Sequence, residues 1–286
     1  MADVLNQIVE KVKESNNILV TVSANPSVDE LSAALGITLL INKLNKHATA
    51  VFSGAVPPAI KFLQPEKTFE STVDSLRDFI IALDKEKADH LRYKIVDDMV
   101  KIFITPYRTT INQKDLDFSQ GDYNVEMVLA IGVKDEADLD HALESHGRIL
   151  HDAVVASVSL GESTQLGSLE WSNPRASCYS EVLCRLANEL RGESRLIDEQ
   201  IATAFLTGIV AATDRFSNAH TSSAAMTVAA QLMADGANQQ LIATKLKESH
   251  DKPIPVPEAK SKDEEKSSKK DESKNSGDIG ALSISH

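Results

Sequence analysis

Positive charge is scarce in this chain, and long apolar runs are missing. Lysine and arginine number 30 against 42 aspartates and glutamates, which gives the 286 residues a formal net charge of −12. Because phosphate backbones and anionic lipid surfaces attract a positive field, this balance argues against generic nucleic-acid binding. No stretch approaches the roughly 18 apolar residues that a membrane-spanning helix needs, so no membrane partner is expected.

Cysteine is scarce as well. Cys178 and Cys184 are the two cysteines, six positions apart in a helical pattern, and their spacing fits neither a disulfide framework nor a zinc-binding Cys-x-x-Cys. The first 14 residues carry three acidic side chains, unlike a secretory signal. These features predict a reducing, cytoplasmic location.

The familiar short motifs of nucleotide binding and hydrolysis are also missing. No Gly-x-Gly-x-x-Gly or P-loop pattern follows a predicted strand. There is no Gly-x-Ser-x-Gly elbow, and neither cysteine has an evident histidine partner.

What is present is an alternation of apolar runs and amphipathic segments. Residues 18–22 and 49–52 are predicted strands on either side of a helix at 28–44, which is typical of parallel β-α-β units. The apolar runs at 127–133 and 153–160 indicate central strands. The remaining predicted elements are helices at 3–13, 136–149, 176–190, 198–212, 222–234 and 238–248. The pattern predicts an α/β fold, with a Rossmann-like, mostly parallel sheet, helices on both faces and a helix-rich C-terminal half.

Two segments depart from this pattern. Residues 91–106 alternate around Asp97-Asp98, which indicates a β-hairpin inside an insertion at 85–120. Residues 251–286 are rich in lysine, acids and serine with few bulky apolar side chains, so we expect a disordered, charged tail. The folded domain is expected to span 1–250.

Four segments resemble, in chain order, the motifs of the DHH phosphoesterase family, which includes RecJ-like exonucleases and oligoribonuclease/pAp phosphatases. They are the strand-turn-helix VTVSANPSVDEL, the strand MVLAIGV followed by KDEADLD, the strand VVASVSL, and the helix end GIVAATDRF followed by SNAHTSS. The resemblance covers most of residues 16–240 and implies the family's fold.

The resemblance also implies where a metal site would lie. In the family, aspartates and histidines at strand ends hold two manganese ions that activate a water molecule for attack on a phosphodiester. The first motif here has Ser23, Ser27 and Asp29 in the ligand positions, so one carboxylate remains. The other ligand positions are occupied by Gly132, Val158, Ser159, Leu160 and Ala212. One carboxylate cannot hold two hydrated cations, so we expect no catalytic residues and no metal or other cofactor.

The remaining residues of the motifs define a candidate cleft for a ligand. Arginine suits bidentate phosphate contacts, and exposed amides at a helix start can hold an anion. We expect Asp29 to be solvated, bonded to helix-start amides or paired, with Arg215 within a few ångströms as its partner. An ion pair of Arg215 with Asp214, and a capping role for Asn25, stay open as alternatives. The candidate residues are Asn25, Asp29, Ser159, Thr213, Asp214, Arg215 and His220.

These observations favour a catalytically inactive, phosphoesterase-like protein. It would bind a nucleotide or another phosphate-bearing small ligand, or act through a protein partner or as a homo-oligomer. One alternative is a metal-dependent phosphoesterase with a rebuilt site, using manganese or magnesium on nucleotides or short oligonucleotides. Another is a structural subunit of an assembly, with the insertion as docking surface.

Overall fold

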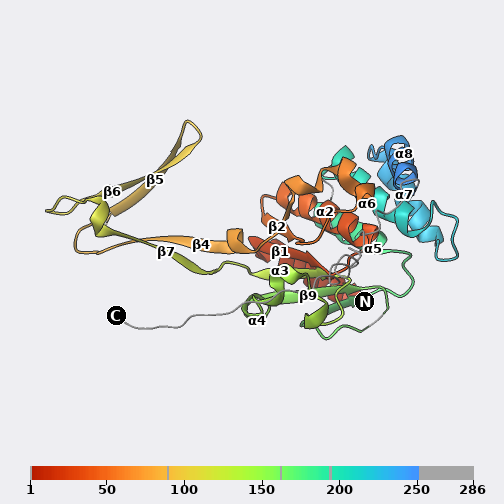
Figure 1. Ribbon diagram of the computed structural model, residues 1–286, viewed down its shortest axis with the longest axis horizontal. Coiled ribbons are helices and arrows are strands. Elements are labelled where there is room, and N and C mark those ends of the chain that lie inside the picture. The colour runs from red at the N-terminus through yellow and green to blue at the C-terminus, as the bar shows by residue number, and fades with distance from the viewer. Residues whose placement is uncertain (1, 89, 162, 193–194, 251–286) are drawn as a thin grey trace, which may run out of the picture. The chain divides into compact units, whose positions relative to one another are not determined.

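The computed structural model describes residues 2–88, 90–161, 163–192 and 195–250; the predicted tail at 251–286 lies outside them. A six-stranded sheet forms the centre, with strand order β10-β9-β8-β1-β2-β3 and parallel pairing throughout (Figure 1). Its strands are β1 (Asn17–Val22), β2 (His47–Val51), β3 (Phe69–Glu70), β8 (Met127–Ile131), β9 (Val154–Ser159) and β10 (Leu169–Ser172). The predicted α/β fold with a mostly parallel sheet is confirmed.

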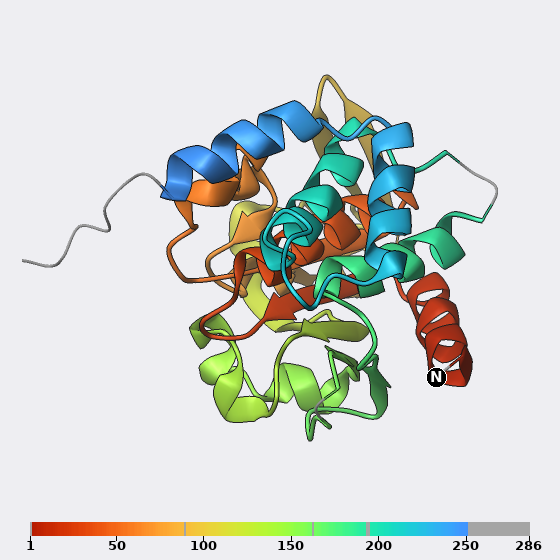
Figure 2. The same cartoon turned by 90° about the vertical axis from the view of Figure 1, so that its right-hand side faces the viewer.

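Both faces of the sheet are buried, as the continuous apolar runs indicate. On β1, Ile18 and Val20 join one core cluster, whereas Leu19 joins the cluster on the other face. The longer helices supply the first cluster, and Figure 2 shows those of the C-terminal half, in cyan and blue, gathered on one side of the sheet. They are α1 (Ala2–Glu14), α2 (Val28–Lys43), α5 (Tyr179–Arg191), α6 (Glu199–Ala212), α7 (Ser223–Ala234) and α8 (Gln239–His250).

The second face is covered by short elements, and here the prediction of one helix over 136–149 is wrong. The segment divides into η5 (Glu136–Asp138), α3 (His141–Glu144) and α4 (Arg148–Asp152). Leu139 is extended and bridges to Ser23 after β1, so the helix is interrupted between η5 and α3. The short helices η1 (Pro58–Leu63), η2 (Pro65–Lys67) and η3 (Asp74–Leu76) lie between β2 and the insertion.

The insertion consists of two separate antiparallel ribbons. β4 (Arg77–Leu83) pairs with β7 (Leu116–Tyr123), and β5 (His90–Val96) pairs with β6 (Met99–Thr105). The helical turn η4 (Gln113–Asp115) precedes β7. Asp97 and Asp98 both have positive φ, 51° and 60°, as a tight two-residue hairpin turn requires, so the predicted hairpin is confirmed. Within the described ranges, no helix combines the length and apolar character that crossing a membrane demands.

Candidate functional site at the carboxyl edge of the sheet

The site predicted from the sequence lies where the parallel strands end. Ser23 follows β1, Gly132 follows β8, and Ser159 ends β9, while α2 and α5 begin beside them. Open parallel sheets bind their ligands at this edge, in the crevice outside the carboxyl ends of the strands. The strand ends and helix starts that carry the first three motifs therefore lie at this edge.

Asp29, the one carboxylate that the sequence places at a ligand position, is buried, and both of its oxygens accept hydrogen bonds. Its Oδ2 accepts a hydrogen bond from the backbone N–H of Tyr179 at 2.6 Å, and its Oδ1 accepts one from that of Ser180 at 3.0 Å. Burial raises the pKa of Asp29 above its ordinary value, although hydrogen bonds from Ser180 and Tyr179 act against that shift. The carboxylate thus joins the start of α2 to the first turn of α5.

Glu30 is a second buried carboxylate, which the sequence reasoning missed. Its Oε2 accepts from the backbone N–H of Ser27 at 2.7 Å, while the Glu30 N–H donates to Ser27 Oγ at 3.1 Å, forming a capping box. The Ser23 hydroxyl donates to Glu30 Oε1 at 3.2 Å. Gly132 has φ +70°, and a Cβ there would overlap Glu30 Oε1, so glycine gives this carboxylate its space.

We expect Glu30 to make the unfolding free energy depend on pH. Burial raises the pKa of Glu30 above its usual 4.5. A raised pKa in the folded state means that its stabilising contribution is complete below the unfolded pKa and is lost as pH rises through the folded pKa. The unfolding free energy of the wild type minus that of Glu30→Gln, measured by urea titration, should therefore fall as the pH rises from the unfolded to the folded pKa of Glu30. A difference that is flat or rises with pH would contradict the assignment.

The other two buried acids have the same kind of partner. Asp140 accepts from the backbone N–H of Ser53 at 3.0 and 3.1 Å and from that of Ala142 at 2.9 Å. Glu181 accepts from the backbone N–H of Ser177 at 2.8 Å. The buried carboxylates of the described chain are thus occupied by backbone amides. Among the described residues, no group of three or more His, Cys, Asp or Glu side chains is arranged to hold a metal ion.

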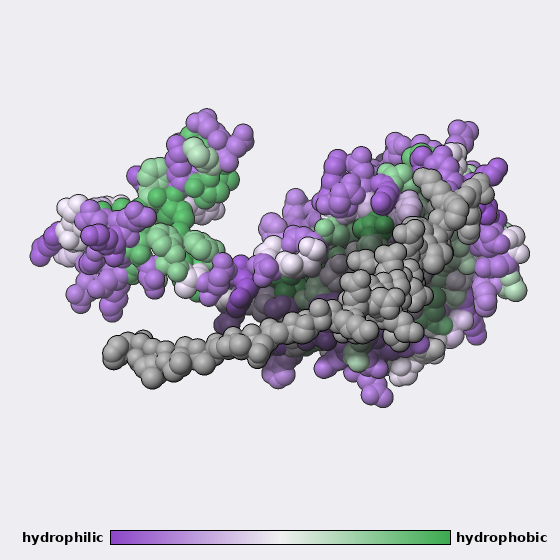
Figure 3. All heavy atoms as spheres, in the orientation of Figure 1, coloured by the Kyte–Doolittle hydropathy of each residue, from purple (hydrophilic) through white to green (hydrophobic). Residues whose placement is uncertain are grey.

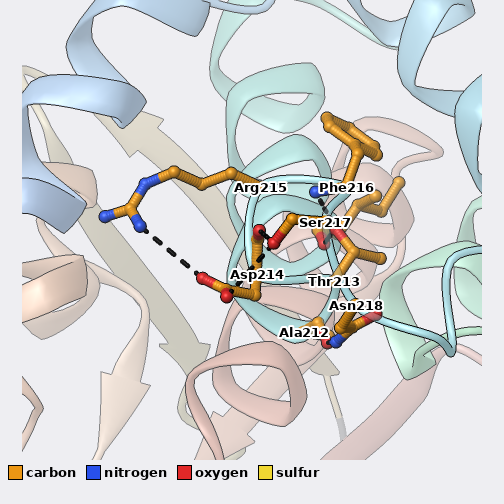
Figure 4. A network of polar contacts seen from close by, with 8 residues as sticks. Ala212, Thr213, Asp214, Arg215, Phe216, Ser217 and Asn218 are labelled. Carbon is orange, nitrogen blue, oxygen red and sulfur yellow. Dashed lines mark hydrogen bonds and ion pairs between the residues drawn. The ribbon is translucent and has the colours of Figure 1, made fainter.

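The fourth motif forms a tight turn after α6 (Figure 4). Asp214, Arg215 and Phe216 all have positive φ, between 45° and 65°. The buried Thr213 hydroxyl donates to the Ile209 carbonyl at 2.6 Å and accepts from the Phe216 N–H at 3.1 Å. Thr213 therefore stabilises the end of the helix and the turn.

The predicted pairing of Asp29 with Arg215 is wrong. The Arg215 guanidinium points to its neighbour Asp214, with Nη1 3.6 Å from Oδ1 (Figure 4), and both side chains are exposed. Asp29 has its oxygens on the amides of α5, which was one of the arrangements left open. A buried carboxylate already satisfied by two N–H donors gains little from a guanidinium that can stay hydrated at the surface.

The remaining candidates do not gather around one point. Asn25 and His220 are exposed, and the His220 backbone N–H donates to Asn218 Oδ1 at 3.2 Å. Ser159 is buried and lines a cavity of about 220 Å³ at the carboxyl edge. Of the seven candidates, Ser159 alone contributes to the lining of this cavity. The full lining is Gly132, Val133, Lys134, Ser159, Leu160, Thr164 and Tyr179.

Comparisons with known proteins bear on the fold. No protein-family model and no curated protein matches the chain. An exopolyphosphatase-related protein from Bacteroides fragilis matches with TM-score 0.63 at 12% identity, over 86% of this chain and 60% of its own. A Methanococcus jannaschii protein provisionally named a family II inorganic pyrophosphatase has TM-score 0.45 at 12% identity, over 81% and 60%. The chain spans 60% of the length of each. It shares the α/β fold of the first.

Proposed function

We propose that this chain is a non-catalytic phosphoesterase-like protein that binds a nucleotide or another phosphate-bearing small ligand at the carboxyl edge of its sheet. The main support for the absence of catalysis is that both carboxylate oxygens of Asp29 already accept hydrogen bonds, from the backbone amides of Tyr179 and Ser180. A cation at this carboxylate would have to displace the amides that begin α5. The other buried acids are held in the same way, so the residues that the structure describes offer no ready set of anionic ligands.

The cavity supports a phosphate-bearing ligand. Its lining includes Lys134, which carries an ammonium group, and Ser159, Thr164 and Tyr179, which carry hydroxyl groups, that of Thr164 being hydrogen-bonded to the Ser157 hydroxyl at 2.6 Å. Ammonium and hydroxyl groups are the side-chain donors that phosphate oxygens accept from. A volume of about 220 Å³ suits a phosphoryl group with part of a nucleotide, and is small for an oligonucleotide. A cytoplasmic location remains part of this proposal.

Metal-dependent hydrolysis is the activity that the proposal excludes. With Mn²⁺ or Mg²⁺ added, the purified chain should not cleave a generic phosphodiester, pAp or a dinucleotide above the background of buffer and metal. The measurement is product formation at increasing protein concentration, with and without EDTA. Turnover that scales with protein and disappears with EDTA would instead select the rebuilt-site phosphoesterase.

Binding without turnover is the positive test. We expect pAp to raise the unfolding midpoint of the wild-type chain, because a ligand that binds the folded state stabilises it. Lys134→Ala should remove most of this shift. Lys67→Ala, which removes the same charge from a separate groove beside α6 and α8, should retain it. Equal shifts in the two variants, or no shift in the wild type, would contradict binding at this cavity.

A further inference from the structure

Exposed apolar side chains concentrate on the two ribbons of the insertion, which we call the arm (residues 77–123). Of the fifteen large hydrophobic residues that are exposed in the described chain, twelve belong to the arm. Figure 3 shows the hydrophobic colouring gathered over these strands. An apolar surface of this extent on a soluble domain marks an interaction site.

The register of the β5–β6 hairpin places its apolar residues on one face. Residues directly opposite in an antiparallel pair point to the same side, and every second pair shares a face. Three apolar pairs alternate along the hairpin and form what we call the hairpin face: Leu91 with Ile104, Tyr93 with Ile102, and Ile95 with Val100. Tyr93, Ile95 and Val100 are 72%, 68% and 66% exposed. The hairpin face therefore carries six apolar side chains without a charge among them.

The opposite, more polar side of the same hairpin carries the basic side chains of the two strands. It has the pair Lys94–Lys101, and Arg92 lies over the ring of its cross-strand neighbour Phe103 at 5.1 Å from the ring centre, but the apolar pair Val96–Met99 lies there too. The charged side chains of the two strands are thus confined to this side, and the hairpin face has none. A two-stranded ribbon is marginal by itself, and in the described part of the chain neither β5 nor β6 pairs with a third strand. Covering the hairpin face would supply the missing stabilisation.

The β4–β7 ribbon extends the apolar surface. Phe79 and Phe118 stack with ring centres 6.1 Å apart, and they remain 61% and 48% exposed. Ile81 lies directly opposite Phe118 and is exposed too. The arm thus offers a partner a second apolar patch, on the ribbon that flanks the hairpin in the sequence.

We propose that the hairpin face is covered by the hairpin face of a second copy of this chain, in a symmetric dimer. Charge complementarity favours a like partner: the arm holds eight basic and nine acidic residues within a chain of net charge −12, so two arms meet with little repulsion. The apolar counterpart must also be the arm. Outside it, the large exposed hydrophobics of the described chain are three residues on α7 and α8: Met226, Met233 and Leu241.

The available area fits this arrangement. An aromatic side chain contributes roughly 150–250 Å² when fully covered. On the hairpin face, Leu91, Tyr93, Ile95, Val100 and Ile102 are exposed at between 49% and 72%. Covering them together with the apolar patch of the β4–β7 ribbon approaches the roughly 800 Å² per partner of a standard interface. Two hairpin faces in contact would form a two-layer sandwich of four strands with its apolar side chains between the layers.

The test is the mass of the full chain in solution. Sedimentation velocity over a concentration series should give a species of twice 31.1 kDa for the wild type. The double variant Ile95→Glu with Val100→Lys should remain at the monomer mass. Its opposite charges face one another across the hairpin, so the strands stay paired while the hairpin face loses its apolar centre. Lys94→Glu on the polar side is the matched control and should still dimerise.

A cross-linking measurement makes the result independent of the stability of the double variant. Cysteine introduced by Tyr93→Cys should be joined between two copies by a short bifunctional maleimide, whereas Lys94→Cys should not; both native cysteines are buried. A wild type that is monomeric at every concentration, or a double variant that still dimerises, overturns the proposal. If the monomer instead floats with phosphatidylcholine vesicles, the hairpin face binds lipid and the dimer is rejected. None of these readouts involves the cavity, so this proposal and the proposed function fail separately.

Discussion

Asp29→Ala is expected to lower the free energy of unfolding by about 2–4 kcal/mol, because one buried and one partly buried amide then lose their acceptor at about 1–3 kcal/mol each. The amides are those of Tyr179 and Ser180, which begin α5. Removing the carboxylate also removes its own cost of burial, which offsets part of this loss and keeps the expected value below the full sum of about 6 kcal/mol. Urea denaturation followed by circular dichroism measures the difference.

Asp135→Ala is the matched control. Asp135 also accepts two backbone hydrogen bonds, from Ala137 at 3.0 Å and Asp138 at 3.1 Å, but it is exposed. Water replaces the lost acceptor there, so the expected cost is about 1 kcal/mol, as for an ordinary helix cap. Equal losses in the two variants would show that Asp29 does not hold α5 in the manner described.

Gly208→Ala is expected to destabilise the fold by about 2–3 kcal/mol, the cost of overpacking a core. The sign is informative, because replacing glycine by alanine inside a helix normally stabilises it by about 1 kcal/mol. A Cβ at Gly208 would overlap Ser180 Oγ and lie 2.6 Å from Asp29 Oδ1. The alanine would therefore force α6 away from the junction of α2 and α5.

Two further variants separate this overlap from a general effect of alanine. At Gly147 an added Cβ meets nothing within 4 Å, so Gly147→Ala should change the unfolding free energy by no more than about 0.5 kcal/mol. Ser180→Ala added to Gly208→Ala removes the overlapping hydroxyl and should recover part of the loss, as a double-mutant cycle can measure. A Gly208→Ala chain as stable as the wild type would contradict the close packing.

The elements that the sequence predicted well are those with a local signal. Buried parallel strands such as β1 and β8 are continuous apolar runs, and α5 to α8 have helical periodicity over a dozen residues. The strands β3, β7 and β10 were missed because they are short or mix polar with apolar residues. The helix at 136–149 failed for a long-range reason: Asp140 bonds the Ser53 amide, 87 residues away.

The same distinction applies to the candidate site. The capping box of Ser27 and Glu30 is a local Ser-x-x-Glu pattern, so sequence inspection alone could have found Glu30. The partners of Asp29 are 150 and 151 residues away, and only the packing of α2 against α5 decides them. Motif matching placed Asp29 at the carboxyl edge of the sheet, but could not tell whether its oxygens were available.

The arm is joined to the rest of the fold at one place, so the sheet does not depend on it. Arg77 pairs with Tyr123 and lies over its ring, and the Asn124 N–H bonds to the Leu76 carbonyl, so the chain leaves the sheet and returns to it at one point. For the sheet, the arm is a loop between β3 and β8, and doubling the length of a loop costs only about 0.6 kcal/mol in closure entropy. The arm could therefore be shortened or replaced with little change to the sheet, and with it the surface that we propose for dimerisation.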